Sequence, residues 1–222
     1  MTRVALVTRV VKPLLYLAAL VPCAWILVAL AAGRVEGDQV KYIQHVTGTT
    51  VLVTLFLTLT VTPLRRATGW NELIRTRRLI GLTAFWYALL HFLSYVVFDQ
   101  ALSLADIADD VAKHPWVLVG FGSFLLLIPL AVTSTNGWIR RLGGKRWQRL
   151  HMLIYPAAVG GVLHYLWLVK KDVRTPLWFA GVLALVFAAR LWAGRARRRP
   201  PTRTRAPRRE PSPLIPVGED VA

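Results

Sequence analysis

Apolar residues in this chain gather in long runs rather than in the short amphipathic patterns of a soluble domain. Each run is close to the roughly 20 residues that a helix needs to cross the hydrocarbon core of a bilayer. The runs cover approximately Pro13–Gly33, His45–Pro63, Leu79–Phe98, Trp116–Thr135, His151–Val169 and Pro176–Gly194. We therefore predict an all-α integral membrane bundle of six transmembrane helices, which occupies residues 1–194.

The composition agrees with a membrane protein, because 55% of the 222 residues are hydrophobic. A formal net charge of +17 would suggest nucleic-acid binding in a soluble protein. Here the basic residues lie in loops and in the C-terminal segment, and no platform of aromatic and basic residues accompanies them. We therefore expect no nucleic-acid partner. Cys23 is the only cysteine, which excludes an intrachain disulfide and a cysteine-based metal site.

The charges between the runs predict how the chain lies in the membrane. The second loop carries Arg65, Arg66, Arg75, Arg77 and Arg78 against Glu72, the third carries Asp99, Asp106, Asp109 and Asp110 against Lys113, and the fourth carries Arg140, Arg141, Lys145, Arg146 and Arg149 without an acid. Since cytoplasmic loops are enriched in Lys and Arg, loops two and four and both termini should be cytoplasmic, and the third loop should be outside. The fifth loop, around Lys170 and Arg174, is mildly basic although this scheme places it outside. The two strongly basic loops outweigh it.

The two ends of the chain need separate interpretations. Ala29-Leu30-Ala31 resembles the cleavage site of a signal peptide, but the apolar stretch before it is long for one, so we interpret it as a retained helix. Residues 195–222 are rich in Arg and Pro and lack apolar runs. We predict that they form a disordered cytoplasmic tail.

Two of the five histidines lie deep inside predicted transmembrane helices. His91 follows Arg78 by 13 residues, about 20 Å along a helix, and His164 follows Arg149 by 15 residues, about 22 Å. Because the third and fifth helices run in the same direction, the two imidazoles should reach a similar depth in the outer half of the bilayer. Ionisable residues at such positions are costly and usually functional. Two facing imidazoles can supply both axial ligands of a haem iron.

Small residues accompany both histidines. On the fifth helix they are Ala157, Gly160 and Gly161, and on the third they are Ala84 and Ala88. They would allow close helix packing and would also clear space for a flat macrocycle. The alternative is that both histidines only form hydrogen bonds between helices and that the glycines serve ordinary packing.

A third histidine, His151, opens the fifth run on the predicted cytoplasmic side, about 20 Å below His164. It suits a second redox site, although 13 residues do not return to the same face of an ideal helix. Arg77 and Arg78 stand at the matching depth of the third helix, and with Lys145 and Arg146 they could hold an anionic cofactor such as a flavin phosphate or a haem propionate. An interfacial histidine in a basic loop is the alternative.

The two remaining histidines are assigned no ligand role. His45 opens the second run at its outer edge, where ligation, a hydrogen bond or helix capping are all open, and we favour a role other than ligation. His114 lies in a loop beside Asp110 and Lys113, and we assign it no function.

Several short motifs occur in a fixed order. They are Gln44-His45-Val46-Thr47-Gly48, Thr62-Pro63-Leu64, Arg75-Thr76-Arg77-Arg78 with Gly81-Leu82, Leu90-His91, Thr133-Ser134-Thr135, the run from Leu142 to His151, and His164-Tyr165-Leu166-Trp167. Together they resemble the MsrQ (YedZ) family, the haem-binding membrane subunits of bacterial protein-methionine-sulfoxide reductase systems. That family belongs to the larger ferric-reductase-like transmembrane group. The resemblance covers about residues 10–190 and leaves out the Arg-rich tail.

The resemblance implies haem b bound through His91, His151 and His164, together with FMN and a bacterial inner-membrane location. It also implies a periplasmic molybdopterin partner like MsrP, which reduces methionine sulfoxide in oxidised envelope proteins. Electrons would come from a cytoplasmic flavin reductase or from quinol. The larger group typically pairs two histidines on the third helix with two on the fifth, whereas this chain has only His91 on the third. The ligand of any second haem therefore stays open.

The sequence contains no Gly-rich phosphate loop, no dinucleotide fingerprint and no hydrolytic constellation. We therefore predict an electron conduit without a final catalytic site of its own, in which the cofactors carry the chemistry. One rival is a quinol-oxidising cytochrome b subunit that serves a different reductase. The other is a non-redox transporter whose histidines relay protons.

Overall fold

The computed structural model describes residues 2–169 and 172–196, with the backbone alone for residues 193–196. Within these residues the fold is entirely helical, which confirms the predicted all-α membrane bundle. The elements are α1 (Arg3–Leu6), η1 (Val7–Val11), α2 (Lys12–Ala31), α3 (Gln39–Thr68), η2 (Asn71–Leu73), α4 (Ile74–Ser94), η3 (Tyr95–Asp99), α5 (Leu104–Lys113), α6 (Pro115–Val132), α7 (Asn136–Leu142), α8 (Gly144–Leu150), η4 (His151–Leu153), α9 (Ile154–Leu168) and α10 (Arg174–Ala196). The predicted tail lies outside the described residues from position 197 onward.

Five helical stretches of the described chain are long and apolar enough to cross a membrane. They are Arg3–Ala31, Gln39–Thr68, Asn71–Asp99, Pro115–Val132 and Arg174–Trp192. The remaining predicted span corresponds to α9, which has 15 residues and follows the 3-10 turn η4. Pro156 stands in the first turn of α9, where its missing N–H breaks no helical hydrogen bond. His151 therefore lies in the turn before this helix rather than in its first turn.

The second predicted loop is shorter than the sequence suggested. Helix α3 continues past Pro63 to Thr68, and α4 already begins at Ile74, so Arg75, Arg77 and Arg78 are helical. Gly69 ends α3 with a φ of 67°, a left-handed conformation that glycine adopts without a steric penalty.

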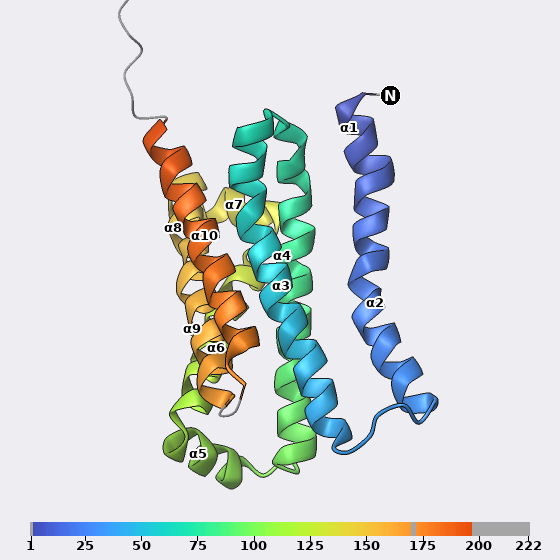
Figure 1. Ribbon diagram of the computed structural model, residues 1–222. Helices are drawn as coiled ribbons and strands as arrows, with labels where there is room; N and C mark the ends of the chain where they lie inside the picture. Colours follow the sequence, from blue (N-terminus) through green and yellow to red (C-terminus); the bar gives the residue numbers. More distant parts are fainter. Residues whose placement is uncertain (1, 170–171, 197–222) are drawn as a thin grey trace, which may run out of the picture.

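The helices pack as antiparallel neighbours around a shared core (Figure 1). Helix α3 lies along α4, α6 lies along α9, and α10 packs against both α3 and α9, whereas α2 stands at the side of α3 and α4. The core contains Leu59 of α3, Ala84 of α4 and Ala158 of α9, each fully shielded from solvent. The alanines let the helix backbones approach closely, as small residues do in membrane bundles.

The two ends of the bundle carry opposite charges. The start of the chain, the α3–α4 turn, α8 and the end of α10 lie at the upper end in Figure 1, and α5 lies at the lower end. We call the upper end the basic end, because it holds the basic residues of the second and fourth loops. We call the lower end the acidic end, after Asp106, Asp109 and Asp110 of α5.

Helix α3 begins near the acidic end with a capping carboxylate. Asp38 accepts hydrogen bonds from the backbone N–H groups of Val40 and Lys41, at 3.0 and 3.1 Å. The side chain of Lys41 also donates to Asp38, which lowers the pKa of this carboxyl group and keeps it ionised as a cap. The cap fixes where α3 starts and so places Gln44 on its second turn.

Candidate functional site

The structure brings His91 of α4 and His164 of α9 together inside the bundle. Their ring centroids lie 6.2 Å apart, and the ring planes are nearly perpendicular, at 82°. The depth arithmetic predicted that these two imidazoles would reach the same level from the basic end, and the two rings do face each other. None of the other transmembrane helices in the described chain contributes a histidine ring to this contact.

Each of these histidines is oriented by a backbone carbonyl of a different helix. His91 Nδ1 lies 3.0 Å from the carbonyl oxygen of Gln44, and His164 Nδ1 lies 2.6 Å from that of Trp116. A carbonyl can only accept, so Nδ1 must carry the proton in both rings. The neutral imidazole then has a free lone pair on Nε2, which is the form that binds a metal. The hydroxyl of Thr47 adds a second contact to His91 Nδ1, at 3.2 Å.

A glycine four residues after each carbonyl makes this arrangement sterically feasible. A Cβ atom at Gly48 would lie 3.1 Å from His91 Cε1, and one at Gly120 would lie 2.6 Å from His164 Nδ1. Position i+4 lies directly over the carbonyl of residue i in a helix. A side chain there would cover the second lone pair of the Gln44 or Trp116 carbonyl. The glycines thus open the carbonyls to the rings.

Two of the three small residues expected beside His164 serve helix packing. A Cβ atom at Gly160 would clash with the side-chain oxygen of Ser123 in α6. One at Gly161 would lie only 3.1 Å from the side chain of Leu52 in α3. Both glycines therefore let neighbouring helices approach closely. This is the ordinary packing role that the sequence left open as the alternative. The ring space depends instead on Gly48 and Gly120. Gly120 was missed because it lies on α6, a helix that has no histidine within it.

The pair suits a metal with two axial ligands. Two bonds of about 2 Å, the usual length for imidazole and a first-row metal, would place the Nε2 atoms about 4 Å apart. The ring centroids lie 6.2 Å apart, a separation that leaves room for one metal ion between the two rings. Among the described residues, no three or more His, Cys, Asp or Glu side chains are grouped so that they could hold a metal ion by themselves. A haem, which supplies the four equatorial nitrogens itself, fits this two-ligand site.

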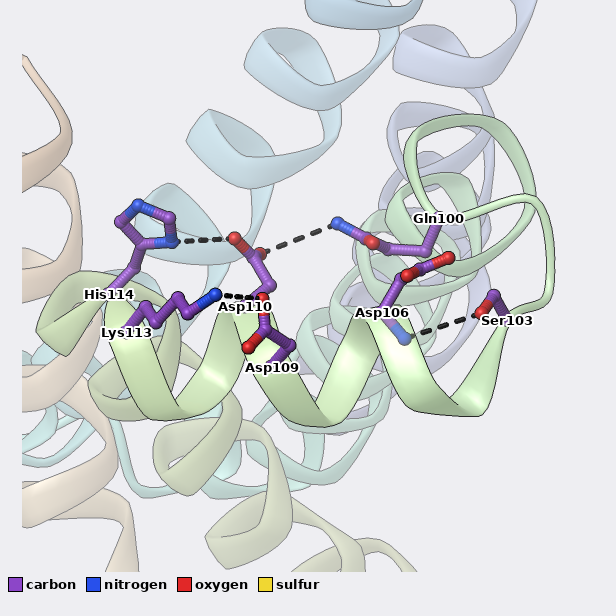
Figure 2. A network of polar contacts seen from close by, with 7 residues as sticks. All are labelled: Gln100, Ser103, Asp106, Asp109, Asp110, Lys113 and His114. Carbon is purple, nitrogen blue, oxygen red and sulfur yellow. Dashed lines mark hydrogen bonds and ion pairs between the residues drawn. The ribbon is translucent and has the colours of Figure 1, made fainter.

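A polar network at the acidic end supports the carbonyl that holds His164. Asp110 of α5 accepts from Tyr95 Oη at 2.6 Å, from His114 Nδ1 at 2.6 Å and from Gln100 Nε2 at 3.4 Å. Figure 2 shows Asp110 between Gln100 and His114. The His114 ring packs on Trp116, with centroids 4.6 Å apart.

His114 was assigned no function from the sequence, and its position shows why that was incomplete. It is the residue before the first turn of α6, and its bond to Asp110 ties α5 to the start of that helix. Since the carbonyl of Trp116 belongs to the same turn, the network fixes the partner of His164. The spacing of four residues between Asp110 and His114 was the available signal, because such pairs meet on a helix.

His151 lies at the basic end, away from the paired rings. Its ring stacks on Trp147 with centroids 3.8 Å apart, and Nδ1 lies 3.1 Å from the carbonyl oxygen of Trp147. By the same argument Nδ1 carries the proton and Nε2 is free. Nε2 is buried and has no hydrogen-bond partner. A buried polar atom without a partner is unusual and indicates a missing ligand or water.

His151 borders a cavity of about 430 Å³ that is rich in cations. Its described lining consists of Arg77, Lys145, Trp147, Gln148, Arg149, His151, Met152, Tyr155 and Arg190. Arg77 and Lys145 thus share this cavity with His151. Arg78 is exposed and lies outside this lining, because successive helix residues point to different faces.

Arg190 is the residue of this cavity that sequence reasoning missed. It lies inside the last apolar run and was counted as part of a transmembrane helix. The signal was present, since an arginine within such a helix is costly and usually has a role. His45, by contrast, is exposed, with its ring centroid 6.2 Å from that of Tyr165.

Comparisons with known proteins show the family of this chain. The model of the ferric reductase like transmembrane component matches residues 45–162, which include His91 and His151. Three relatives are each named protein-methionine-sulfoxide reductase heme-binding subunit MsrQ. The chain is 43% identical to that of Herminiimonas arsenicoxydans, with 84% of this chain and 87% of the relative covered. It is 46% identical to that of Ralstonia nicotianae (83% and 86% covered) and 45% identical to that of Rhodospirillum rubrum (83% and 88% covered). The chain therefore belongs to the MsrQ family of ferric-reductase-like transmembrane proteins.

Proposed function

We propose that this protein is a membrane electron-transfer subunit that holds haem b between His91 and His164. The observation that carries the proposal is the pairing of two rings whose Nδ1 atoms are both committed to carbonyls, which leaves both Nε2 atoms free to bind iron. Haem, when bound, supplies a one-electron couple at its iron. The names of the relatives, which are heme-binding subunits, support the same cofactor.

The residues of the chain would hold and tune this cofactor. His91 and His164 would each donate one nitrogen, and the carbonyls of Gln44 and Trp116 would fix the tautomer and raise the basicity of the ligands. The surrounding apolar helices would exclude water from the iron. No residue of the pair needs to change its protonation state when an electron passes.

The charges of the two ends support a direction for the electrons. The basic end would face the cytoplasm, with both termini, and the acidic end would face the periplasm of a bacterial inner membrane. The His91–His164 pair then lies in the outer half of the bilayer, near the surface from which an electron must leave. The acceptor would be a periplasmic molybdopterin methionine sulfoxide reductase, in which the final catalytic step would occur. The relatives' names support a partner of this kind.

Electrons would enter at the basic end. The cavity beside His151, with Arg77 and Lys145 in its lining, would hold an anionic cofactor such as FMN or the propionates of a second haem. Arg78, on the exposed face, would meet a cytoplasmic flavin reductase or the outer part of the same cofactor. His151 Nε2, which is buried without a partner, would contact that cofactor directly.

Quinol is a second candidate donor, and one observation favours it. A cavity of about 820 Å³ opens between α3 and α10 at the basic end. Its lining is mostly apolar, with Leu64, Val186 and Trp192, and Arg65 and Arg66 stand among them. An apolar slot at this depth suits a hydrophobic quinol. Reduction of the purified protein by a quinol, compared with reduction by a flavin reductase and its nicotinamide donor, distinguishes the two sources.

An optical spectrum of the purified protein tests the proposal as a whole. We expect the bands of a six-coordinate low-spin haem, and we expect His91→Ala and His164→Ala each to lose that coordination. The double variant should lose the haem, whereas His45→Ala should retain it. A wild-type protein without haem would favour a non-redox proton-relay transporter. A full low-spin spectrum in His164→Ala, with loss in His45→Ala, would move the ligand to α3.

A further inference from the structure

Arg190 is held in place by a helix carbonyl that a proline has freed. In α3 the carbonyl of Leu59 would normally accept from the N–H of residue 63, but that residue is Pro63, which has no N–H. Arg190 of α10 donates from one guanidinium nitrogen to this carbonyl, at 2.5 Å. The bond satisfies a buried acceptor and fixes the guanidinium at the junction of α3 and α10.

The rest of the Arg190 guanidinium belongs to the cavity beside His151. Its central carbon lies 5.2 Å from the centroid of the Tyr155 ring, and both residues line that cavity. A guanidinium has five N–H donors in a planar fork, and the Leu59 carbonyl occupies only one nitrogen. Arg190 thus lines the cavity and keeps N–H donors that the bond to Leu59 does not use.

The cavity gathers positive charge without a negative partner among its described lining. Arg77, Lys145, Arg149 and Arg190 all line it, and no Asp or Glu does. Arg77 and Arg190 are partly buried, whereas Lys145 and Arg149 are exposed. Because like charges in a partly buried space repel one another, a bound anion would stabilise this lining. The rings of Trp147 and Tyr155 in the same lining suit a planar ligand.

We propose that Arg190 is an anion-binding residue of this cavity, which acts with Arg77 to clamp the acid group of a planar cofactor. The proposal deepens the proposed function, because it rests on a cofactor bound at the basic end. The acid group is a phosphate monoester or a carboxylate, since a guanidinium fork binds either one through two parallel hydrogen bonds. The proline in α3 is what fixes the fork in position.

The test compares binding of FMN and of riboflavin, which has the same ring system without the phosphate, to the purified full-length protein. For a phosphate ligand, Arg190→Gln should weaken FMN binding about tenfold or more, because bonds between ions are among the strongest single contacts. Riboflavin binding should not change. Arg190→Lys should give an intermediate loss, since it retains the charge and lacks the fork. Arg140→Gln, an exposed arginine on α7, is the matched control and should bind FMN normally.

A second variant separates ligand binding from support of the fold. Pro63→Ala returns an N–H to the Leu59 carbonyl, so the double variant Pro63→Ala/Arg190→Gln needs no arginine to satisfy α3. The proposal expects the double variant to bind FMN as weakly as Arg190→Gln. Restored binding in the double variant would overturn it, because Arg190 would then serve only the helix.

The total haem content distinguishes the remaining outcomes. If Arg190→Gln loses a second haem while the haem of the His91–His164 pair remains, the result supports a carboxylate ligand, which is the propionate of that second haem. Unchanged FMN affinity together with unchanged haem content overturns the proposal, and so does an equal loss of FMN and riboflavin. The low-spin spectrum is measured on each sample. A wild-type protein without that spectrum would contradict the proposed function, whereas the FMN and haem results of the variants test this inference.

Discussion

The two ends of the bundle differ in how completely their polar groups are paired. At the acidic end Asp110 receives hydrogen bonds from three side chains, and these contacts close the network within the protein. At the basic end the buried Arg65 Nε, Trp70 Nε1 and His151 Nε2 have no hydrogen-bond partner in the described chain. Both cavities described above also open at this end.

This difference indicates which end of the bundle can pair its buried polar groups without a ligand. An unsatisfied buried donor or acceptor costs about 1–3 kcal/mol, so three of them at one end are a considerable cost. A ligand or ordered water that pairs with them would recover that cost. The acidic end supports the histidine pair from within the protein, whereas the basic end has the chemistry of an entry site for something outside the chain.

The largest expected effect comes from a methyl group at Gly120. Gly120→Ala would place a Cβ atom 2.6 Å from His164 Nδ1, closer than real contacts allow, and His164 would have to leave the carbonyl of Trp116. We expect loss of most of the low-spin haem in the spectrum of the purified protein. Gly122→Ala on the same helix is the control, since no atom lies within 4 Å of its added Cβ. Equal haem content in both variants would show that the carbonyl contact does not hold the ligand.

His151→Ala should separate the two ends. His151 lies in η4 at the basic end, where its ring stacks on Trp147. We expect the low-spin spectrum of the paired site to persist, and the cofactor retained at the basic end to fall severalfold. Flavin and total haem content per protein measure the second effect. A complete loss of low-spin haem would instead assign His151 to the outer site.

A smaller effect is expected from Asp110→Asn, which keeps the shape of the side chain and removes its charge. The bonds from Tyr95 and His114 become weaker, so we expect a loss of about 1–3 kcal/mol in the free energy of unfolding. Thermal unfolding in detergent, followed by the haem absorbance, measures it. Asp106→Asn is the control, because the Asp106 side chain is exposed on the same helix. Equal stability of the two variants would mean that the network does not brace the acidic end.

The smallest perturbation tests which end faces which compartment. Single cysteines at Arg66 and Asp109 in a Cys23→Ser background replace exposed side chains, so folding should be unaffected. A membrane-impermeant reagent added to intact cells that have a permeable outer membrane should label position 109 and not position 66. Labelling of position 66 alone would invert the proposed direction of electron flow.

Much of the fold was accessible from the sequence, because the bilayer imposes one simple rule. Apolar runs of bilayer length must be helical, and the depth of a histidine follows from the helical rise, so the meeting of His91 and His164 was predictable. Which carbonyl would hold each ring was not predictable. It depends on contacts between helices far apart in the sequence, such as Trp116 with His164.

Pro63 and Arg190 were both misjudged from the sequence, and both errors have the same cause. Pro63 was taken as the end of a helix, yet α3 continues past it, because Arg190 from the last helix satisfies the freed carbonyl. Arg190 itself was counted as part of the last apolar run without being singled out. Each residue explains the other, but they are 127 positions apart, and no local pattern connects them.

The carbonyls that hold the two rings also constrain how the protein can be assembled in the cell. His91 and His164 lie on α4 and α9, and their partners Gln44 and Trp116 lie near the starts of α3 and α6. A metal that binds both Nε2 atoms therefore joins four separate helices at one point. Ribosomal synthesis delivers α9 last of these four, so the prosthetic group must be acquired after nearly the whole chain has entered the membrane. Fragments that end before α9 should be inserted as helices and yet remain colourless.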